Sequence, residues 1–242
     1  EAEENARYRL AITYHNMKER AKAAEQYQAL LEKFPASRYA AQALFHLGEF
    51  QLREQKDALK AIESYQASLD KSPGPDLSAL ALRGLALARY ERKDYEMAAD
   101  QFLRLVREFP QTALPEEVYT WCGQWFYDAA KWAEAIAVLD GLLKALPEYP
   151  YADKVRFTTA ECAEKAGDAA DALARYQATV EANPTGAKAV EAKYRMARLH
   201  EQAGEVDKAL ALYEEASSAN TGEVAAQARF RLGELFEARG EH

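Results

Sequence analysis

Apolar residues recur along the chain at steps of three and four positions, which is the spacing of one face of an α-helix. Segments 43–55 (ALFHLGEFQLREQ) and 192–204 (AKYRMARLHEQAG) are typical of this pattern. A break follows such a segment, for example at Lys56-Asp57, and a second amphipathic segment then begins. The pattern therefore predicts consecutive units of two helices each.

The second helix of each unit keeps nearly the same sequence pattern along the chain. Its leading alanines are separated by 38 residues once and by 37 residues four times. The first five copies end in proline, whereas the sixth has Thr221 in that place. The copies are AAEQYQALLEKFP (23–35), AIESYQASLDKSP (61–73), AADQFLRLVREFP (98–110), AIAVLDGLLKALP (135–147), ALARYQATVEANP (172–184) and ALALYEEASSANT (209–221). Such a period along the whole chain predicts a repeat protein.

Helix boundaries can also be predicted from the sequence. Asp57, Asp94 and Asp168 each lie four residues before a leading alanine, where their side-chain oxygens can cap the second helix. The proline that follows closes this helix, because proline supplies no N–H donor. In the link after the first proline, we expect Ser37 to be the N-cap of a first helix that starts early.

The anchor positions of these units resemble the tetratricopeptide repeat (TPR), whose signature is W-x2-L-G-x2-Y…A-x3-F…P. Leu47-Gly48 and Leu232-Gly233 match this signature directly. Relaxed matches are Leu10-Ala11…Tyr14, Leu85-Ala86, Cys122-Gly123…Phe126, Thr159-Ala160 and Met196-Ala197. The small residue is expected wherever two helices approach closely. The resemblance implies an all-α fold, a right-handed α-solenoid of stacked helix-turn-helix units.

The resemblance extends over essentially the whole chain and implies a single TPR solenoid domain over residues 1–242. We expect about six and a half repeats, and the last helix is expected to be a cut through a longer array. The repeats are placed at about 2–36, 37–75, 76–112, 113–149, 150–186 and 187–221, with a half repeat at 222–242.

The links between repeats suggest a compartment. The 37-residue period exceeds the usual 34, and links of the form FPxSxYAxxA resemble those of bacterial cell-envelope TPR proteins. Examples are the periplasmic TPR protein of the Tol–Pal system and the TPR lipoprotein of the outer-membrane barrel assembly machine. We therefore expect a periplasmic or envelope-associated protein, with the cytoplasm as the alternative. Since the chain begins with Glu1 rather than Met, we expect a processed or trimmed piece.

Charge and composition narrow the function classes. The net charge of −8 disfavours nucleic acid and anionic membranes as partners, because both require a basic surface. No apolar run approaches the length of a membrane-spanning helix. The sequence contains no Ser/His/Asp, P-loop or zinc signature, and its four histidines are scattered, so we expect no enzyme, cofactor or metal. Cys122 and Cys162 are expected to be buried structural thiols.

In TPR arrays the first helices line a concave groove, and this resemblance implies the function. We expect a non-catalytic scaffold that binds a peptide or protein partner through aromatic and arginine side chains. The alternatives are a self-assembling structural TPR protein, or an adaptor domain cut from a larger envelope lipoprotein or enzyme. The expected groove residues are Tyr8, His46, Arg83, Trp121, Tyr127, Phe157, Tyr194, Arg195 and Arg198.

Two further expectations follow from the position that each residue occupies within the repeat. Chaperone-binding TPR domains hold a C-terminal carboxylate with Lys, Asn and Arg side chains, but the corresponding positions here are Tyr8, Ile12, His46, Leu80 and Gly84. None of these residues matches, so a chaperone clamp is disfavoured. In segment 118–132 (VYTWCGQWFYDAAKW), the positions within the repeat predict that Cys122 and Phe126 lie in the core and that Trp121 and Tyr127 face the groove.

Overall fold

The computed structural model describes residues 2–218 and 222–239. In these residues the chain forms thirteen α-helices and no strand, which confirms the all-α class. The helices are α1 (Ala2–Asn16), α2 (Arg20–Lys33), α3 (Ala40–Arg53), α4 (Ala58–Asp70), α5 (Pro75–Glu91), α6 (Tyr95–Glu108), α7 (Glu116–Asp128), α8 (Trp132–Ala145), α9 (Ala152–Lys165), α10 (Ala169–Ala182), α11 (Ala187–Gln202), α12 (Val206–Ser217) and α13 (Glu223–Arg239).

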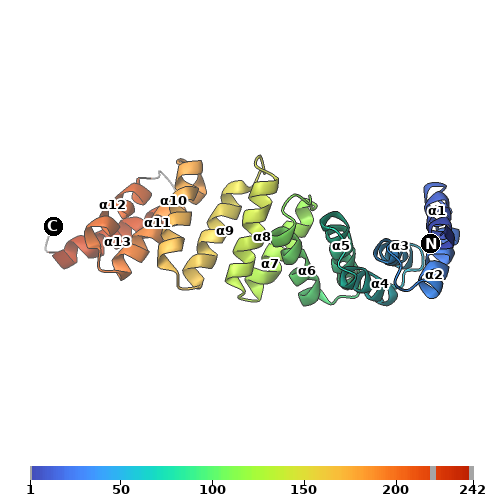
Figure 1. The fold of residues 1–242 in the computed structure, drawn as a ribbon. Coiled ribbons are helices and arrows are strands. Elements are labelled where there is room, and N and C mark those ends of the chain that lie inside the picture. The colour runs from blue at the N-terminus through green and yellow to red at the C-terminus, as the bar shows by residue number, and fades with distance from the viewer. Residues whose placement is uncertain (1, 219–221, 240–242) are drawn as a thin grey trace. The chain divides into compact units, whose positions relative to one another are not determined.

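The helices form two compact units, Glu1–Leu114 with α1 to α6 and Pro115–His242 with α7 to α13. Within each unit every helix packs against the next one along the chain (Figure 1). Helices two apart along the chain are also in contact: α3 contacts α5, and α11 contacts both α9 and α13. This stacking of helix pairs is that of an α-solenoid, as predicted. The assignment of all residues to one domain stays a prediction.

The repeated alanines lie where the helices approach most closely. All six leading alanines are buried, with Ala23 at 2% exposure and the other five at 0%. The residue four positions later is also buried and is usually aromatic: Tyr27, Tyr65, Phe102, Leu139, Tyr176 and Tyr213. A small side chain followed by a large one thus fills the space within and between repeats at the density of a protein core.

Four glycines lie on first helices, and at three of them the missing side chain allows two helices to approach closely. A Cβ atom on Gly48 would lie 2.8 Å from the Tyr65 ring, and one on Gly84 would lie 2.4 Å from it. One on Gly123 would lie 2.5 Å from Leu139. Gly233 differs, since its Cβ would meet nothing within 4 Å among the described residues. Close approach therefore explains the first three glycines but not the fourth.

Two of the three predicted aspartate caps form. The Asp57 side chain accepts a hydrogen bond from the Lys60 backbone N–H at 3.1 Å, and Asp168 accepts one from that of Asp171 at 3.0 Å. Asp94 occupies the N-cap position of α6 without a side-chain capping bond.

The prediction for Ser37 is wrong, because α3 begins at Ala40 with Tyr39 as its N-cap. The Ser37 hydroxyl instead accepts from the Tyr39 N–H at 3.1 Å and donates to Glu4 at 2.5 Å. The extra length of the link is therefore used in a turn ahead of the helix. This turn is tied to α1 by a side-chain hydrogen bond.

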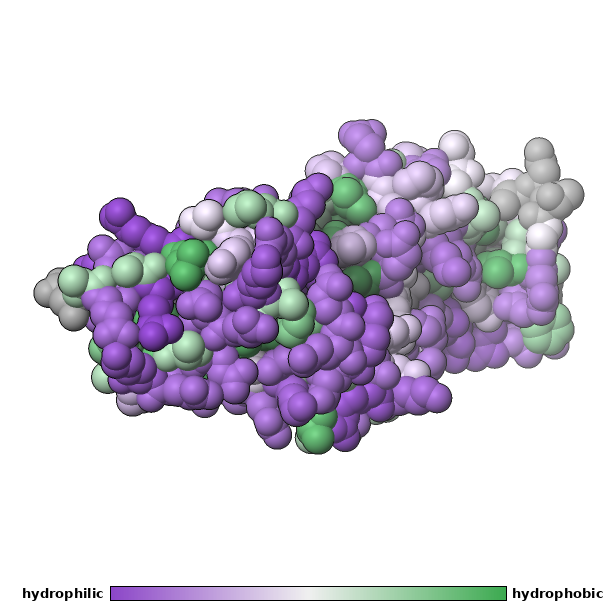
Figure 2. Space-filling view, turned by 90° about the vertical axis from the view of Figure 1, so that its right-hand side faces the viewer, coloured by the Kyte–Doolittle hydropathy of each residue, from purple (hydrophilic) through white to green (hydrophobic). Residues whose placement is uncertain are grey.

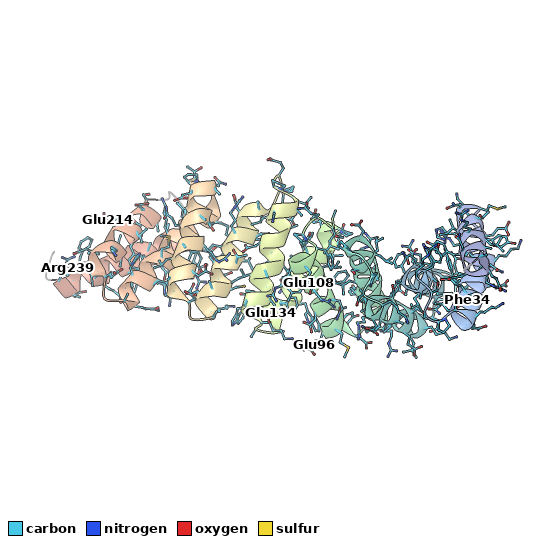
Figure 3. The ribbon with its side chains drawn as sticks, in the orientation of Figure 1. Phe34, Glu96, Glu108, Glu134, Glu214 and Arg239 are labelled. Carbon is cyan, nitrogen blue, oxygen red and sulfur yellow. The ribbon has the colours of Figure 1, made fainter. Side chains whose placement is uncertain are left out.

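Hydrophilic side chains cover most of the face shown in Figure 2, and hydrophobic ones form small separate patches. Acidic residues such as Glu96 and Glu108, near the two ends of α6, are exposed (Figure 3). Among the described helices, none is both long and apolar enough to cross a membrane.

Candidate partner-binding grooves

The first groove lies between α11 and α13, and we call it the α11–α13 groove. Its volume is about 570 Å³. Tyr194 and Arg198 of α11 form one wall, Phe230 of α13 forms the other, and Tyr213 of α12 lies at its base. The Phe230 side chain is 69% exposed, which leaves a large apolar surface open to a partner.

A charged network holds the walls of this groove together. Glu201 accepts hydrogen bonds from the Tyr213 hydroxyl at 2.9 Å and from Arg231 at 2.6 Å. Burial raises the pKa of Glu201, but these hydrogen bonds outweigh burial and hold the pKa below its usual value. Arg198 is exposed and makes no ion pair within 4 Å of any described carboxylate, although its charge also lowers the pKa of Glu201.

The second groove lies between α7 and α9, and we call it the α7–α9 groove. It has a volume of about 250 Å³. Its base is Leu139, which is 6% exposed and lies so close to Gly123 that a Cβ atom there would be 2.5 Å from it. Tyr127 of α7 and the link residues Tyr149 and Tyr151 form aromatic walls. An apolar floor between aromatic walls suits the side chain of an apolar residue.

Tyr127 is fixed in this wall by its neighbours. Its ring meets Trp132 edge to face at 5.4 Å between centroids, and the Lys165 ammonium lies 4.2 Å from its centroid. Lys165 also donates a hydrogen bond to the Tyr127 hydroxyl at 2.5 Å, and this bond raises the pKa of the lysine. The aromatic wall is thus held in place before any partner arrives.

Both grooves use the same helical positions of the repeat. Thr120, Gln124 and Tyr127 line one wall of the α7–α9 groove. Tyr194, Arg198 and Glu201, which follow them by 74 residues, line the same wall of the α11–α13 groove. The repeat thus provides the site, and its variable side chains change the chemistry from aromatic to charged.

A family model for the tetratricopeptide repeat matches five parts of the chain, which together cover most of it. The matched residues are 8–75, 52–113, 123–187, 157–223 and 194–242. The chain belongs to the tetratricopeptide repeat family.

Solved TPR structures are similar to this chain in fold. A TPR protein from Parabacteroides merdae ATCC 43184 is 18% identical, with a TM-score of 0.50 over 100% of this chain and 88% of its own. YrrB, a TPR protein with an unusual peptide-binding site, is 18% identical with a TM-score of 0.42 over 85% and 98%. The TPR2AB domain of yeast Sti1 in its pHSP90 complex is 14% identical with a TM-score of 0.41 over 98% of both chains. Among curated protein sequences, none matches the chain.

In this TPR array, four of the nine predicted residues lie in the two grooves or beside them. Tyr127 lines the α7–α9 groove, and Tyr194 and Arg198 line the α11–α13 groove. Arg195 is half-buried and forms ion pairs with Glu161 at 3.4 Å and Glu164 at 3.5 Å, so its charge is already matched within the repeat array.

Two predicted aromatic groove residues are placed differently. Phe157 is only 2% exposed and packs in the core beside Tyr176, with the Lys188 ammonium 4.2 Å above its ring. The prediction of Phe157 as a groove residue is therefore corrected. Trp121 is half-buried, stacks on Trp125 at 6.1 Å, and is not among the residues that line the α7–α9 groove. Its role as a partner anchor stays a prediction.

The remaining three lie in the first unit. Tyr8 is half-buried and stacks on Tyr39 at 4.0 Å, and burial raises its pKa. Arg83 is half-buried on α5. His46 of α3 lines a separate cavity with His15 and other polar residues. The aromatic groove residues that the sequence prediction missed are Phe230 of α13 and the link residues Tyr149 and Tyr151.

Neither cysteine has the surroundings of a reactive thiol. Cys122 and Cys162 are both buried at 0% exposure, as predicted. Burial raises the pKa of Cys122, and it raises that of Cys162 to about 11. Both thiols therefore stay protonated at neutral pH and are poor nucleophiles. In the part of the chain that the structure describes, no group of three metal-binding side chains comes together.

Proposed function

We propose that this chain is a non-catalytic scaffold that binds a peptide or protein partner in the grooves between the first helices of neighbouring repeats. The TPR fold is typical of protein–protein interaction scaffolds, which supports the general class. The observation that carries the proposal is the pair of open grooves at equivalent positions of the second unit. The compartment we propose is the bacterial cell envelope, on the strength of the link sequences.

The two grooves favour different parts of a partner. In the α7–α9 groove, Leu139 and the walls formed by Tyr127 and Tyr151 accept an apolar or aromatic side chain. In the α11–α13 groove, Arg198 offers an exposed positive charge in a groove that the exposed ring of Phe230 also lines. Aromatic and arginine side chains are frequent hot spots of protein interfaces. We therefore propose a peptide that combines an apolar anchor with an acidic residue.

The test begins by selecting peptides that bind the wild-type chain from a displayed library of random peptides. Tyr151→Ala and Phe230→Ala each remove an exposed ring from one groove, and because both rings are exposed, helicity and unfolding should barely change. We expect the double variant to lose at least about tenfold in affinity, or about 1.4 kcal/mol.

Glu214→Gln is the matched control, because Glu214 is exposed on α12 and lines neither groove (Figure 3). The control should bind every selected peptide as the wild type does. Selection of no peptide, or equal binding of the peptides to the double variant, would refute the proposed groove.

A further inference from the structure

The cavity that contains His46 differs from both grooves. It lies in the first unit among α1, α2 and α3 and has a volume of about 190 Å³, room for one small group. Its polar lining consists of His15, Arg20, Tyr27, His46, Glu49 and Arg53. We call it the histidine cavity.

Two polar atoms of the histidine cavity are buried without a hydrogen-bond partner among the described residues. One is the hydroxyl of Tyr27, whose side chain is 1% exposed, and the other is Nδ1 of His46. The closest carboxylate oxygen to that nitrogen belongs to Glu49 at 3.6 Å, beyond hydrogen-bond distance. Buried polar groups in proteins are nearly always paired, so the Tyr27 hydroxyl points to a missing acceptor and His46 Nδ1 to a missing partner.

Later repeats of the same chain show which group is missing. The hydroxyl of Tyr176 donates to Glu164 at 2.6 Å, and the hydroxyl of Tyr213 donates to Glu201 at 2.9 Å. In both cases the glutamate lies twelve residues before the tyrosine. The residue twelve positions before Tyr27 is His15, so the first repeat has the tyrosine donor but lacks the carboxylate.

The third member of this arrangement is a cation from the next repeat. Arg195 pairs with Glu164 at 3.5 Å, and Arg231 pairs with Glu201 at 2.6 Å. The position that corresponds to Arg195 beside the first repeat is His46, 149 residues earlier. His46 stacks on Tyr27 with a centroid distance of 5.1 Å, and it lies 4.8 Å from His15.

We propose that the histidine cavity binds a carboxylate group, which occupies the place that the glutamate side chain holds in the later repeats. The Tyr27 hydroxyl donates to one carboxylate oxygen, and a ring N–H of His46 donates from the position that the arginine holds in those repeats. The carboxylate is supplied by an acidic side chain of a partner or by a small free carboxylate. Of the five chaperone-type clamp positions, His46 lines this cavity, whereas Tyr8, Ile12, Leu80 and Gly84 do not.

The surrounding charges make binding depend on protons. On α2, Arg20 is already paired with Glu54, and on α3, Arg53 faces Glu49 at 3.4 Å. The other ionisable groups that face the two histidines are Tyr27 of α2 and Glu49 of α3, whose carboxylate lies 3.6 Å from His46 Nδ1 and is shared with Arg53. Since both arginines and Glu49 already have partners of opposite charge, a proton taken up by His15 balances the charge of the ligand.

The direction of the pH dependence follows from the state of His15. Burial and the nearby His46 lower the pKa of His15, so the empty cavity holds it largely neutral at neutral pH. Glu49 acts on it in the opposite sense, and Arg20 in the same sense as burial. A bound carboxylate favours the protonated ring, and binding therefore takes up a proton and tightens as the pH falls.

The test is a titration of the whole chain with sodium acetate, followed by the imidazole NMR signals of His15 and His46. Sodium chloride at the same ionic strength is the control titration. We expect a saturable shift of both signals, with an affinity at least about fivefold higher near pH 6 than near pH 8. A second arm uses a terminally blocked peptide with one glutamate, beside the same peptide with glutamine.

Three variants make the test specific. His15→Glu restores the arrangement of the later repeats, fills the cavity with its own carboxylate and should abolish acetate binding. Tyr27→Phe removes the donor and should weaken binding about tenfold. Tyr176→Phe, the equivalent change in a repeat whose carboxylate is internal, should bind acetate as the wild type does.

The outcomes separate the two sources of carboxylate. Binding of the glutamate peptide without acetate assigns the cavity to an acidic side chain of a partner, and acetate binding alone assigns it to a small free carboxylate. The proposal is overturned if neither probe moves the histidine signals, or if His15→Glu binds as tightly as the wild type. Because Tyr151 and Phe230 lie in the other unit, failure of groove binding leaves this result unaffected.

Discussion

Two equivalent tyrosines should respond differently to the loss of one oxygen atom. In the wild type the Tyr176 hydroxyl donates to Glu164 at 2.6 Å, whereas the Tyr27 hydroxyl has no partner among the described residues. Both rings are buried, with 0% and 1% exposure, so a phenylalanine fills either site equally well. The change Tyr→Phe therefore isolates the hydrogen bond from the packing.

The magnitude follows from the surroundings of each hydroxyl. A hydrogen bond to a charged group contributes about 1.5–3 kcal/mol. Glu164 is 22% exposed and keeps Arg195 at 3.5 Å, so water and the arginine offset part of the loss. We therefore expect Tyr176→Phe to destabilise its repeat by about 1–2 kcal/mol. Tyr27→Phe removes an unpaired buried polar group and should be neutral or stabilising by up to about 1 kcal/mol.

The assay must report on each repeat, because unfolding of a solenoid need not be a single two-state transition. Native-state amide hydrogen exchange gives an opening free energy for α2 and for α10 separately. The exchange free energy of α10 should fall in Tyr176→Phe, while that of α2 should stay or rise in Tyr27→Phe. An equal loss in both variants would show that Tyr27 has a hydrogen-bond partner, and the argument for an unfilled acceptor site would fail.

Three further outcomes are expected. Gly84→Ala places a methyl group 2.4 Å from the Tyr65 ring and should lower the free energy of unfolding by about 1–3 kcal/mol in urea titrations, whereas Gly233→Ala, with open space around it, should raise it by up to about 1 kcal/mol. Trp121→Ala should lower the thermal midpoint as well as any partner affinity, because the ring is half-buried, and an unchanged melt would contradict this packing. The Cys122 thiol should react with a disulfide reagent only at the rate of unfolding, and rapid labelling of the native chain would refute its burial.

Much of the fold could be predicted, because equivalent residues of successive repeats form the same packing contacts. Ala61 and Tyr65 are buried for the reason that Ala172 and Tyr176 are, so one period predicts the others. The link was harder to predict, because Ser37 can equally cap a helix or close a turn, and its hydrogen bond to Glu4 decides for the turn.

The candidate site was less predictable, because the position of a residue on a helix determines which way its side chain points but not which neighbouring residues cover that side chain. Phe157 and Phe230 occupy equivalent positions of the repeat, two residues before Thr159-Ala160 and Leu232-Gly233, yet their exposures are 2% and 69%. The difference at Phe157 involves Lys188, which is far along the sequence and lies over the ring. The aromatic link residues Tyr149 and Tyr151 belong to no helical row, so periodicity could not assign them to a groove.

Two departures from the repeat leave room for ligands, in addition to the α11–α13 groove at the intact pair of Tyr213 and Glu201. At Tyr176 and Tyr213 the buried hydroxyl donates a hydrogen bond to a glutamate of the same repeat, so the hydroxyl has its partner within the repeat. Leucine at the same position, Leu139, has no hydroxyl to satisfy and forms the base of the α7–α9 groove. Tyr27 keeps the hydroxyl but has His15 in place of the glutamate, and a polar cavity results. A change at one of two positions thus converts a structural contact into an apolar pocket or a polar one, and the two kinds of pocket require different ligands.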